Sequence, residues 1–426
     1  MNANEYVIKS ATLADRHGER FADVVIRDGV IAAIGPDLAA PHEVSAHGCV
    51  ITSPLVDLCA HSGEPGREEI ETIASLSRAA ALGGFGTVLL MATTEPVADS
   101  AAVVQEITAR TVDALCRIEI AGALTVGCNG EQLAPMAELA ALGIKIFTDA
   151  GSGIQSSRLL RRAMEYGAGL NVTIAQRCHD AALGGHAVMH EGAVSSKLGM
   201  VGSPSEAEEI AVMRELALSR LTGARLHLQQ VSTAGSVAMI EGAKAAGMDI
   251  SCDIATQHVV FTDEACESFD PRFRLEPPLR SATDREAIAA GLASGVIDAI
   301  VSQHTPVADH EKDQPFDQAP PGTLGLEYAF ALAMTHSSLS LQQLLPAMSW
   351  RPGQILGLSG TYAGTIAPGM PADLIVIDPQ HEWTIPADGG ASLSRNVCFA
   401  EMNVRGKVRH SFVGGELVVH EFEATR

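Results

Sequence analysis

The sequence has few aromatic residues, little positive charge and no long apolar run, and each shortage excludes a class of protein. Phe, Tyr and Trp make up 4% of the 426 residues, and 29 basic residues stand against 51 acidic ones, a net charge of −22. Nucleic acid and anionic membranes would repel such a chain, so neither is expected as a partner. No apolar run approaches the ~18 residues of a membrane helix, and the N-terminus lacks a secretory signal pattern. We therefore expect a cytoplasmic protein.

Cysteine is also scarce. The eight cysteines include no C-x-x-C pair. In a chain of this length they are more simply explained as reduced, buried thiols than as a disulfide framework. Cys59 differs from the others because it stands at the end of a predicted strand, where a functional loop would begin.

The middle of the chain alternates between strand and helix patterns. Eight segments have the composition of strands: 50–58, 87–91, 118–124, 144–148, 170–175, 225–231, 248–253 and 298–302. Eight strands, each followed by a helix over roughly 300 residues, predict an α/β fold of the (β/α)₈ type, with functional residues at the C-terminal strand ends. The irregular stretch 305–322 is rich in proline and is interpreted as a mobile loop over the barrel mouth.

Both ends of the chain are rich in short strands. Near the N-terminus, Asp28-Gly29 has the pattern of a two-residue hairpin turn, and Gly414-Gly415 plays the same part near the C-terminus. These ends are predicted to pair into one small β-sandwich domain, formed by residues 1–50 and 366–426. The barrel would then occupy residues 51–365.

Seven short motifs carry a resemblance to a known family. They are Glu64-Pro65-Gly66, Pro277-Pro278-Leu279-Arg280, Gly325-Leu326-Glu327, Ala372-Asp373-Leu374 and the segments 78–85, 147–151 and 231–237. Taken in their order along the chain, they resemble the motifs of the type I dihydroorotases. These are metal-dependent members of the amidohydrolase superfamily that cyclise carbamoyl aspartate. The likeness covers almost the full chain and implies a TIM-like barrel of amidohydrolase type.

The resemblance also implies a metal site, and this chain departs from it. In the family, histidines, a bridging carboxylate and a final aspartate surround one or two zinc ions, which activate water and polarise the amide carbonyl. The family's His-x-His pair is Cys59 and His61 in this sequence, and the bridging aspartate is Asp149.

The remaining positions of that set carry residues that bind zinc poorly. Arg177 and Gln230 stand where the resemblance implies histidines, and Gln303 stands where it implies the catalytic aspartate. A guanidinium keeps its positive charge at physiological pH and would oppose a dication. With Gln303 in place of the aspartate, no catalytic residue is expected.

The positions implied to hold the substrate differ as well. Gly63 replaces an arginine that clamps the substrate carboxylate, Thr93 replaces an asparagine, and Glu276 replaces another asparagine. A carboxylate at 276 would repel an anionic substrate. Metal, base and carboxylate clamp are all altered together.

Our main interpretation is a catalytically silent dihydroorotase-like protein without a metal, in which Asp149 pairs with Arg177 as an internal ion pair. The resemblance implies that such a protein would be a structural or regulatory partner of aspartate carbamoyltransferase in pyrimidine biosynthesis, and a homo-oligomer. His179, Asp180, His258 and His304 are interpreted as structural.

The alternative is an active zinc-dependent cyclic amidohydrolase with an unusual mononuclear site. Thiolate, imidazole and carboxylate all bind zinc, so Cys59, His61 and Asp149 would be the ligands. The substrate would be dihydroorotate or a related cyclic amide or hydantoin-type ring. A nucleophilic role for Cys59 is a weaker possibility, because no completed Cys-His-Asp arrangement follows it.

Overall fold

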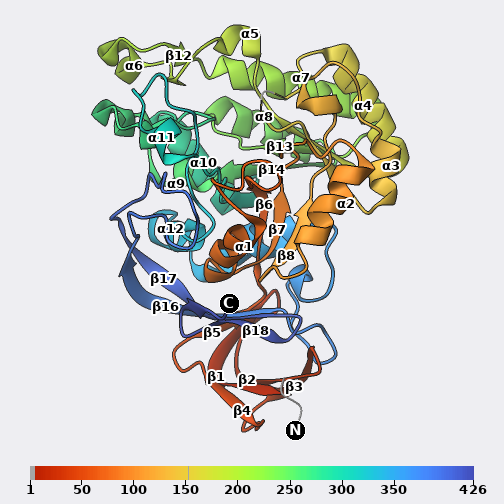
Figure 1. The fold of residues 1–426 in the computed structure, drawn as a ribbon, viewed down its shortest axis with the longest axis vertical. Helices are drawn as coiled ribbons and strands as arrows, with labels where there is room; N and C mark the ends of the chain where they lie inside the picture. Colours follow the sequence, from red (N-terminus) through yellow and green to blue (C-terminus); the bar gives the residue numbers. More distant parts are fainter. Residues whose placement is uncertain (1–4, 152) are drawn as a thin grey trace.

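A barrel of eight parallel strands forms the main body of the protein. The computed structural model describes residues 5–151 and 153–426, and in this part of the chain the barrel strands are β6 (Leu55–Ala60), β7 (Phe85–Leu90), β8 (Arg117–Ile120), β9 (Ile146–Phe147), β10 (Thr173–Arg177), β13 (Leu226–Gln229), β14 (Ile250–Ala255) and β15 (Ala299–Val301). Two isolated parallel bridges, Gly122 with Phe147 and Ala60 with His304, close the ring between the two sheets. The predicted (β/α)₈ barrel is confirmed (Figure 1).

The barrel strands form because their residues are buried on both faces. Every residue of β6 and β7 is buried, as is usual for parallel strands that face a filled interior on one side and helices on the other. Val56, Leu58 and Leu89 belong to the apolar cluster that fills the barrel interior. The strand ends are thereby held in a rigid ring.

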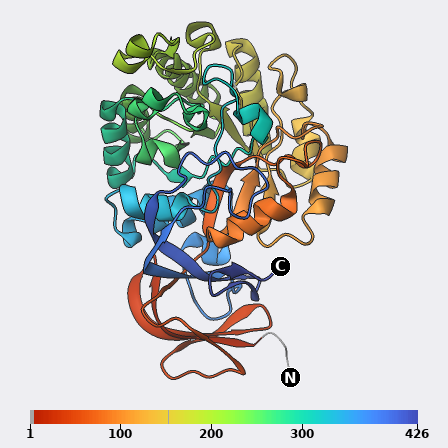
Figure 2. The same ribbon diagram turned by 60° about the vertical axis from the view of Figure 1, so that its left-hand side comes forward.

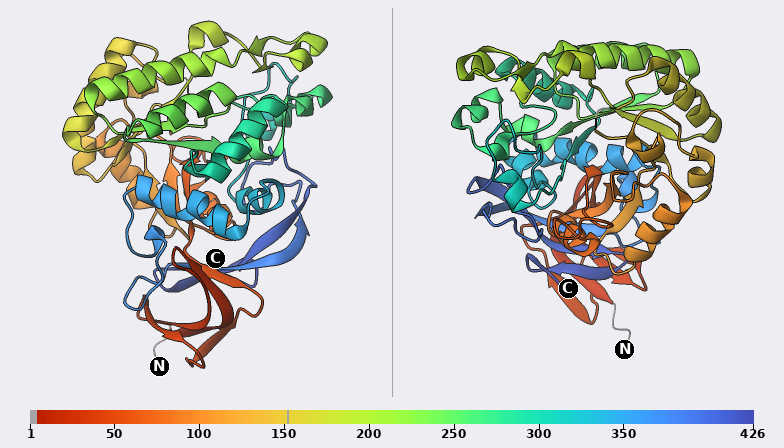
Figure 3. Two further views of the ribbon diagram at one scale, coloured as in Figure 1. Left: turned by 180° about the vertical axis from the view of Figure 1, so that it is seen from behind. Right: turned by 45° about the horizontal axis from the view of Figure 1, so that its top comes forward.

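Helices surround this ring, as the right-hand view of Figure 3 shows. The longer ones are α1 (Ile73–Leu82), α2 (Ala101–Arg110), α4 (Ser157–Leu170), α7 (Glu206–Thr222), α8 (Ala234–Ala245), α10 (Ala282–Ser294) and α12 (Ala329–His336). The shorter ones are α3 (Met136–Ala141), α5 (Ala181–Gly184), α6 (Ala193–Leu198), α9 (Thr256–Val260), α11 (Asp309–Lys312), α13 (Leu341–Leu345) and α14 (Arg351–Ile355). None of the helices in the described residues is long and apolar enough to cross a bilayer.

Strands from both ends of the chain share a second sheet below the barrel (Figures 1 and 2). Its nine strands in the described residues are β1 (Tyr6–Asp15), β2 (Gly18–Arg27), β3 (Val30–Gly35), β4 (His42–Ser45), β5 (Val50–Thr52), β16 (Leu374–Thr384), β17 (Asn403–Val413), β18 (Glu416–His420) and β19 (Glu423–Ala424). The antiparallel pairing of β5 with β16 joins the N-terminal strands to the C-terminal ones. A small pair of strands, β11 (Met189–His190) and β12 (Gly202–Ser203), lies outside both sheets.

The two hairpin turns read from the sequence have the expected backbone. Asp28 and Gly29 have φ of 50° and 78°, and Gly414 and Gly415 have φ of 57° and 81°. Positive φ at both central residues is the mark of the hairpin turn that matches the twist of the strands. Ala372 connects the two turns, since its N–H donates to Gly29 O over 2.9 Å and its O accepts the N–H of Gly415 over 3.1 Å.

Candidate active site

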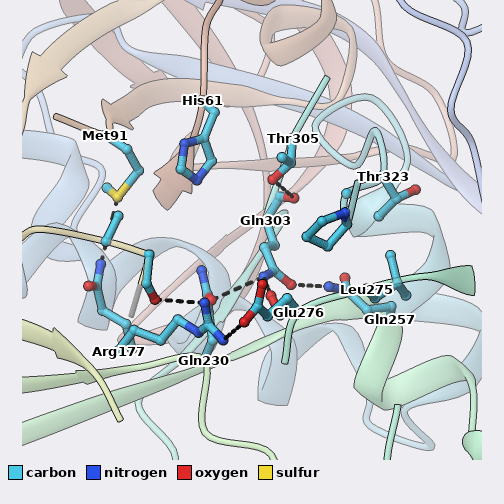
Figure 4. Close-up of a pocket in the computed structure, with 15 residues that line it drawn as sticks. His61, Met91, Arg177, Gln230, Gln257, Leu275, Glu276, Gln303, Thr305 and Thr323 are labelled. Atoms are coloured by element: carbon cyan, nitrogen blue, oxygen red, sulfur yellow. Dashed lines mark hydrogen bonds and ion pairs between the residues drawn. The ribbon is translucent and has the colours of Figure 1, made fainter. Parts of the chain in front are cut away.

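A cavity of about 160 Å³ opens at the C-terminal ends of the barrel strands, where barrel enzymes carry their active sites. The side chains around it are mostly polar, with several amides and few charges (Figure 4). It is lined by His61, Met91, Ala150, Gly151, Arg177, Gln229, Gln230, Gln257, Leu275, Glu276, Gln303, Thr305, Pro321, Gly322 and Thr323. The irregular stretch 305–322 thus contributes to the cavity wall.

Three glutamine side chains form a hydrogen-bonded chain across the cavity. Gln257 Nε2 donates to Gln303 Oε1, and Gln303 Nε2 donates in turn to Gln230 Oε1 over 3.0 Å. Gln230 Nε2 then donates to Cys59 Sγ over 2.9 Å. Each amide therefore fixes the orientation of the next, and the chain ends on a buried thiol.

Two of these glutamines stand on unusual backbone. Gln230 and Gln303 have φ of 54° and 46°, a left-handed conformation that costs a non-glycine residue roughly 1–2 kcal/mol. Such strain persists where the surroundings hold it, and it is common at functional sites. The Gln230 backbone N–H is held by Asp253 Oδ1 over 2.6 Å. Both side chains are thus aimed into the cavity by tertiary contacts.

Arg177 carries the positive charge of the cavity and is paired within it. It ends β10 and is 8% exposed, with Nη2 donating to Glu276 Oε1 and Nη1 to Gly151 O, each over 2.6 Å. Burial acts to raise the pKa of Glu276, but the charge and hydrogen bond of Arg177 outweigh it and lower the pKa. The two side chains therefore form an ion pair.

The predicted pair between Asp149 and Arg177 is wrong. Asp149 is 4% exposed and accepts hydrogen bonds from the backbone N of Thr125 over 2.8 Å and from Thr125 Oγ1 over 2.5 Å. Burial raises the pKa of Asp149 in spite of these bonds. Because Thr125 satisfies both carboxylate oxygens, Asp149 is held away from the cavity and Arg177 turns to Glu276.

His61 is the basic side chain of the cavity. Its Nδ1 shares a hydrogen bond of 2.9 Å with Thr93 Oγ1, and its backbone N donates to His304 O over 2.8 Å. Burial, with smaller contributions from His304 and Arg177, lowers the pKa of His61 to about 4. The imidazole is therefore neutral near pH 7 and can accept a proton.

Cys59 lies beneath the cavity rather than in it. Its side chain is 1% exposed and accepts the amide of Gln230. Burial, followed by the negative charges of Asp253 and Asp57, raises the pKa of the Cys59 thiol well above its usual value. A protonated, buried thiol is a poor nucleophile.

The residues at the predicted metal positions do not fit a zinc ion. Cys59, His61 and Asp149 are all in the described part of the chain, but their ligand atoms form no cluster there. The one cluster of three such atoms found among the described residues joins His410, His420 and Glu421 in the other sheet. A zinc site needs its ligands to converge within about 2.0–2.3 Å of one point. No chemical step is therefore assigned to a metal at these positions.

The altered substrate positions have structural explanations. At Gly63 an added Cβ would lie 1.9 Å from Arg67 O and 2.6 Å from Ile70 Cγ1, so this loop has no room for a side chain. Thr93 is engaged by His61. The carboxylate clamp that the family resemblance implies is therefore absent from position 63 in this loop conformation.

The histidines interpreted as structural are held by the framework. His304 Nε2 lies 3.2 Å from Glu71 Oε2, and its Nδ1 accepts the backbone N–H of Gly325 over 3.3 Å. His258 Nε2 donates to Pro278 O over 3.1 Å. Both rings thus hydrogen-bond to the protein itself, although His258 Nδ1 is buried without a partner among the described residues.

His179 and Asp180 form no ligand pair. Asp180 caps α5 by accepting the N–H of Leu183 over 2.9 Å. Burial, followed by the charge of Arg177, lowers the pKa of His179. Asp180 therefore has a capping role.

Two further amides of the cavity were not predicted from the sequence. Gln229 ends β13 and accepts Thr148 Oγ1 over 2.7 Å, and Gln257 lies just after β14. Their place near the ends of predicted strands could have pointed to them, because strand ends meet at one face of a barrel. Neither belongs to a motif that singles it out.

Comparison with known proteins places the chain in a family. Residues 48–236 match the model of the family described as Dihydro-orotase-like. A protein named dihydroorotase from Geobacter sp. (strain M21) is 40% identical over 403 residues, covering 93% of this chain and 94% of that protein. The chain belongs to the dihydroorotase-like family of the amidohydrolase superfamily. A dihydroorotase from Pelotomaculum thermopropionicum is 38% identical over 423 residues, covering 97% of this chain and 98% of that protein.

Solved structures share the architecture of this family member. The L-hydantoinase of Arthrobacter aurescens matches with a TM-score of 0.88 at 22% identity, covering 99% of this chain and 97% of that one. The dihydropyrimidinase of Brevibacillus agri matches with a TM-score of 0.85 at 20% identity, covering 99% and 96%. At this identity the likeness shows the fold, a TIM barrel with a β-sandwich domain, and confirms the predicted fold class.

The family relationship overturns our main interpretation of the sequence. A catalytically silent protein was expected, yet relatives about 40% identical over 93–95% of the chain carry the name of an active hydrolase. The error lay in weighing the ligand positions alone, without the kinship to these relatives along almost the whole chain. The prediction of an inactive protein is therefore wrong.

Proposed function

We propose that the chain is an active hydrolase of cyclic amides, acting on dihydroorotate or a related ring. The observation that carries this proposal is the 38–40% identity to dihydroorotases along almost the whole chain. In the reaction, water oxygen bonds to a ring carbonyl carbon and the ring C–N bond breaks. The nitrogen takes a proton and the carbonyl becomes a carboxylate; the reverse reaction closes the ring.

The cavity supplies groups suited to this chemistry. The neutral imidazole of His61 accepts a proton from the attacking water, since its pKa of about 4 leaves it unprotonated near pH 7. Side-chain amides of the glutamine chain line the same cavity and are the proposed donors to the carbonyl oxygen as negative charge develops on it. His61 is thus the base of the proposed reaction.

Zinc dependence is implied by the family resemblance, but it is not part of this proposal. Cys59 is buried under an amide and Asp149 is bound by Thr125, so the donor set does not meet. Metal analysis of the purified chain tests this directly. About one zinc per chain, lost in Cys59→Ala, would restore the metal-dependent alternative.

Replacing His61 by asparagine tests the proposed base. Purified wild-type chain is expected to open at least one of dihydroorotate, dihydrouracil and hydantoin. His61→Asn keeps a polar group beside Thr93 and should lower kcat by about 10²–10⁴-fold, because it cannot accept the proton. His17→Asn, at an exposed position of the other domain, is the matched control and should leave kcat unchanged.

Two outcomes of that assay would contradict the proposal. No ring opening by the wild-type chain with any of the three substrates would remove the hydrolase function. Equal kcat in His61→Asn and wild type would remove His61 from the reaction.

Association with aspartate carbamoyltransferase and self-association stay predictions from the resemblance, and a cytoplasmic location stays a prediction from the sequence pattern. An active enzyme can have any of these properties. Co-purification of the two proteins from cells that express both, followed by size-exclusion chromatography, measures both kinds of association. Separate elution of the carbamoyltransferase would contradict the predicted association between the two proteins. A monomeric mass for this chain would contradict the predicted self-association.

A further inference from the structure

The charges that line the cavity cancel. Among the described residues around it, the ionisable side chains are His61, Arg177 and Glu276. Arg177 and Glu276 lie 2.6 Å apart and neutralise each other. The one guanidinium that lines this cavity in the described part of the chain therefore offers a ligand no unpaired positive charge.

Among the residues that the structure describes, no cation that lines this cavity is free to bind a carboxylate. Both terminal nitrogens of Arg177 are engaged, by Gly151 O and by Glu276, and its Nε is buried. Arg274 lies behind Glu276, outside the cavity lining, and its terminal nitrogens contact the backbone oxygens of Leu275 and Ala187. The chain as a whole, at −22, also repels anions at a distance.

The amides of the cavity are suited to a different chemistry. A side-chain amide carries both donors and an acceptor, and a cyclic ureide presents N–H and C=O groups in alternation around its ring. Gln257 lines the cavity wall, and its Oε1 is buried without a hydrogen-bond partner among the described residues. A ring N–H that reached this oxygen would satisfy it. Met91 and Leu275 supply apolar contact for the ring.

We propose that this site takes a neutral cyclic ureide, such as dihydrouracil or hydantoin, in preference to a ring that carries a carboxylate, such as dihydroorotate. The inference rests on the proposed function and deepens it by naming the substrate class. A carboxylate would lose its hydration and gain no counter-charge in return, because Glu276 has already taken the charge of Arg177.

Dihydrouracil and dihydroorotate differ by one carboxylate and form a matched pair of probes. Isothermal titration calorimetry on the wild-type chain should show dihydrouracil binding at least about tenfold more tightly. Equal or tighter binding of dihydroorotate, or binding of neither ring, would overturn the inference. This comparison uses the wild-type protein alone and depends on no variant.

Glu276→Gln tests whether the charge of Glu276 sets the preference between the same two rings. The substitution keeps the shape of the side chain and releases the charge of Arg177 into the cavity. Affinity for dihydroorotate should rise about tenfold, while affinity for dihydrouracil changes by less than about twofold. Glu267→Gln removes an equal charge at an exposed position, where Glu267 pairs with Lys197, and should change neither affinity. Unchanged dihydroorotate binding in a folded Glu276→Gln protein would count against the inference.

Turnover measured with the same two rings separates the two proposals. Selective binding of dihydrouracil without ring opening would remove the hydrolase function and leave the ligand preference standing. A higher kcat/KM for dihydroorotate than for dihydrouracil would remove the preference and leave the hydrolase function standing.

Discussion

At the residue scale, the side chain of Arg177 governs the electrostatics of the cavity. It lies at the end of β10, with one terminal nitrogen on Glu276 and the other on Gly151 O. Its charge is therefore neutralised by a partner within the protein. The main hydrogen-bonding groups that a ligand meets are then the amides of Gln230, Gln257 and Gln303. The preference for a neutral ring follows from this pairing.

Gly63 offers a residue-scale test of the loop after β6. Gly63→Ala places a Cβ within 1.9 Å of Arg67 O, so the loop must shift and the free energy of unfolding should fall by about 1–3 kcal/mol. Gly242→Ala, in α8 with open space around it, should raise the free energy of unfolding by about 0.5–1 kcal/mol. Urea denaturation of both variants measures these changes. A neutral Gly63→Ala would show that the loop accepts a side chain.

The family resemblance singled out five residues that line the cavity in the structure. His61, Arg177, Gln230, Gln303 and Glu276 all line the cavity. Their partners could not be predicted, since hydrogen bonds join positions far apart in the sequence. Thr125, which binds Asp149, and Glu276, which binds Arg177, are examples at separations of 24 and 99 residues.

At the element scale, a buried carboxylate links two of the family motifs. Glu208 of α7 is 2% exposed and accepts the backbone N–H groups of Ser232 and Thr233 over 2.9 and 3.1 Å. Arg280, also buried, donates to Ser232 Oγ over 3.0 Å and lies 3.7 Å from Glu208. The motifs 231–237 and 277–280 thus hold the loops of the barrel mouth in place. They do not line the cavity wall themselves, but the residues that precede them, Gln230 and Glu276, do.

The segment 305–322 is held by a lysine whose charge is disfavoured. Lys312 ends α11, is 5% exposed, and donates to Arg274 O and Pro320 O over 3.1 and 2.8 Å. Burial lowers the pKa of Lys312 from 10.5 to about 7. Its sequence neighbours suggested an exposed loop, and burial of this side chain depends on contacts that the sequence alone does not show.

This lysine predicts a pH dependence of stability. Between about pH 7 and 10.5 the unfolded chain binds a proton at Lys312 and the folded chain does not, so the free energy of unfolding should rise with pH in this window. The slope is up to about 1.4 kcal/mol per pH unit, and below pH 7 this contribution is constant. Lys312→Met should remove the slope in urea denaturation at pH 7, 8 and 9. An identical slope in the variant would assign it to other groups.

At the scale of the whole molecule, the fold could be predicted almost completely. Alternating strand and helix patterns gave the barrel, and turn pairs with positive φ gave the hairpins of the other sheet. These features depend on local sequence, which a single chain displays. The activity was predicted wrongly, because it depends on how distant side chains meet, and because kinship to dihydroorotases along 93–97% of the chain outweighs the count of altered ligands.

The ring-opening rate of the purified wild-type chain with dihydrouracil, measured beside that of His61→Asn, tests the central claim most directly. We expect turnover by the wild-type chain and a kcat lower by about 10²–10⁴-fold in the variant. Absence of ring opening by the wild-type chain, with dihydrouracil and with the other two rings, would contradict the account.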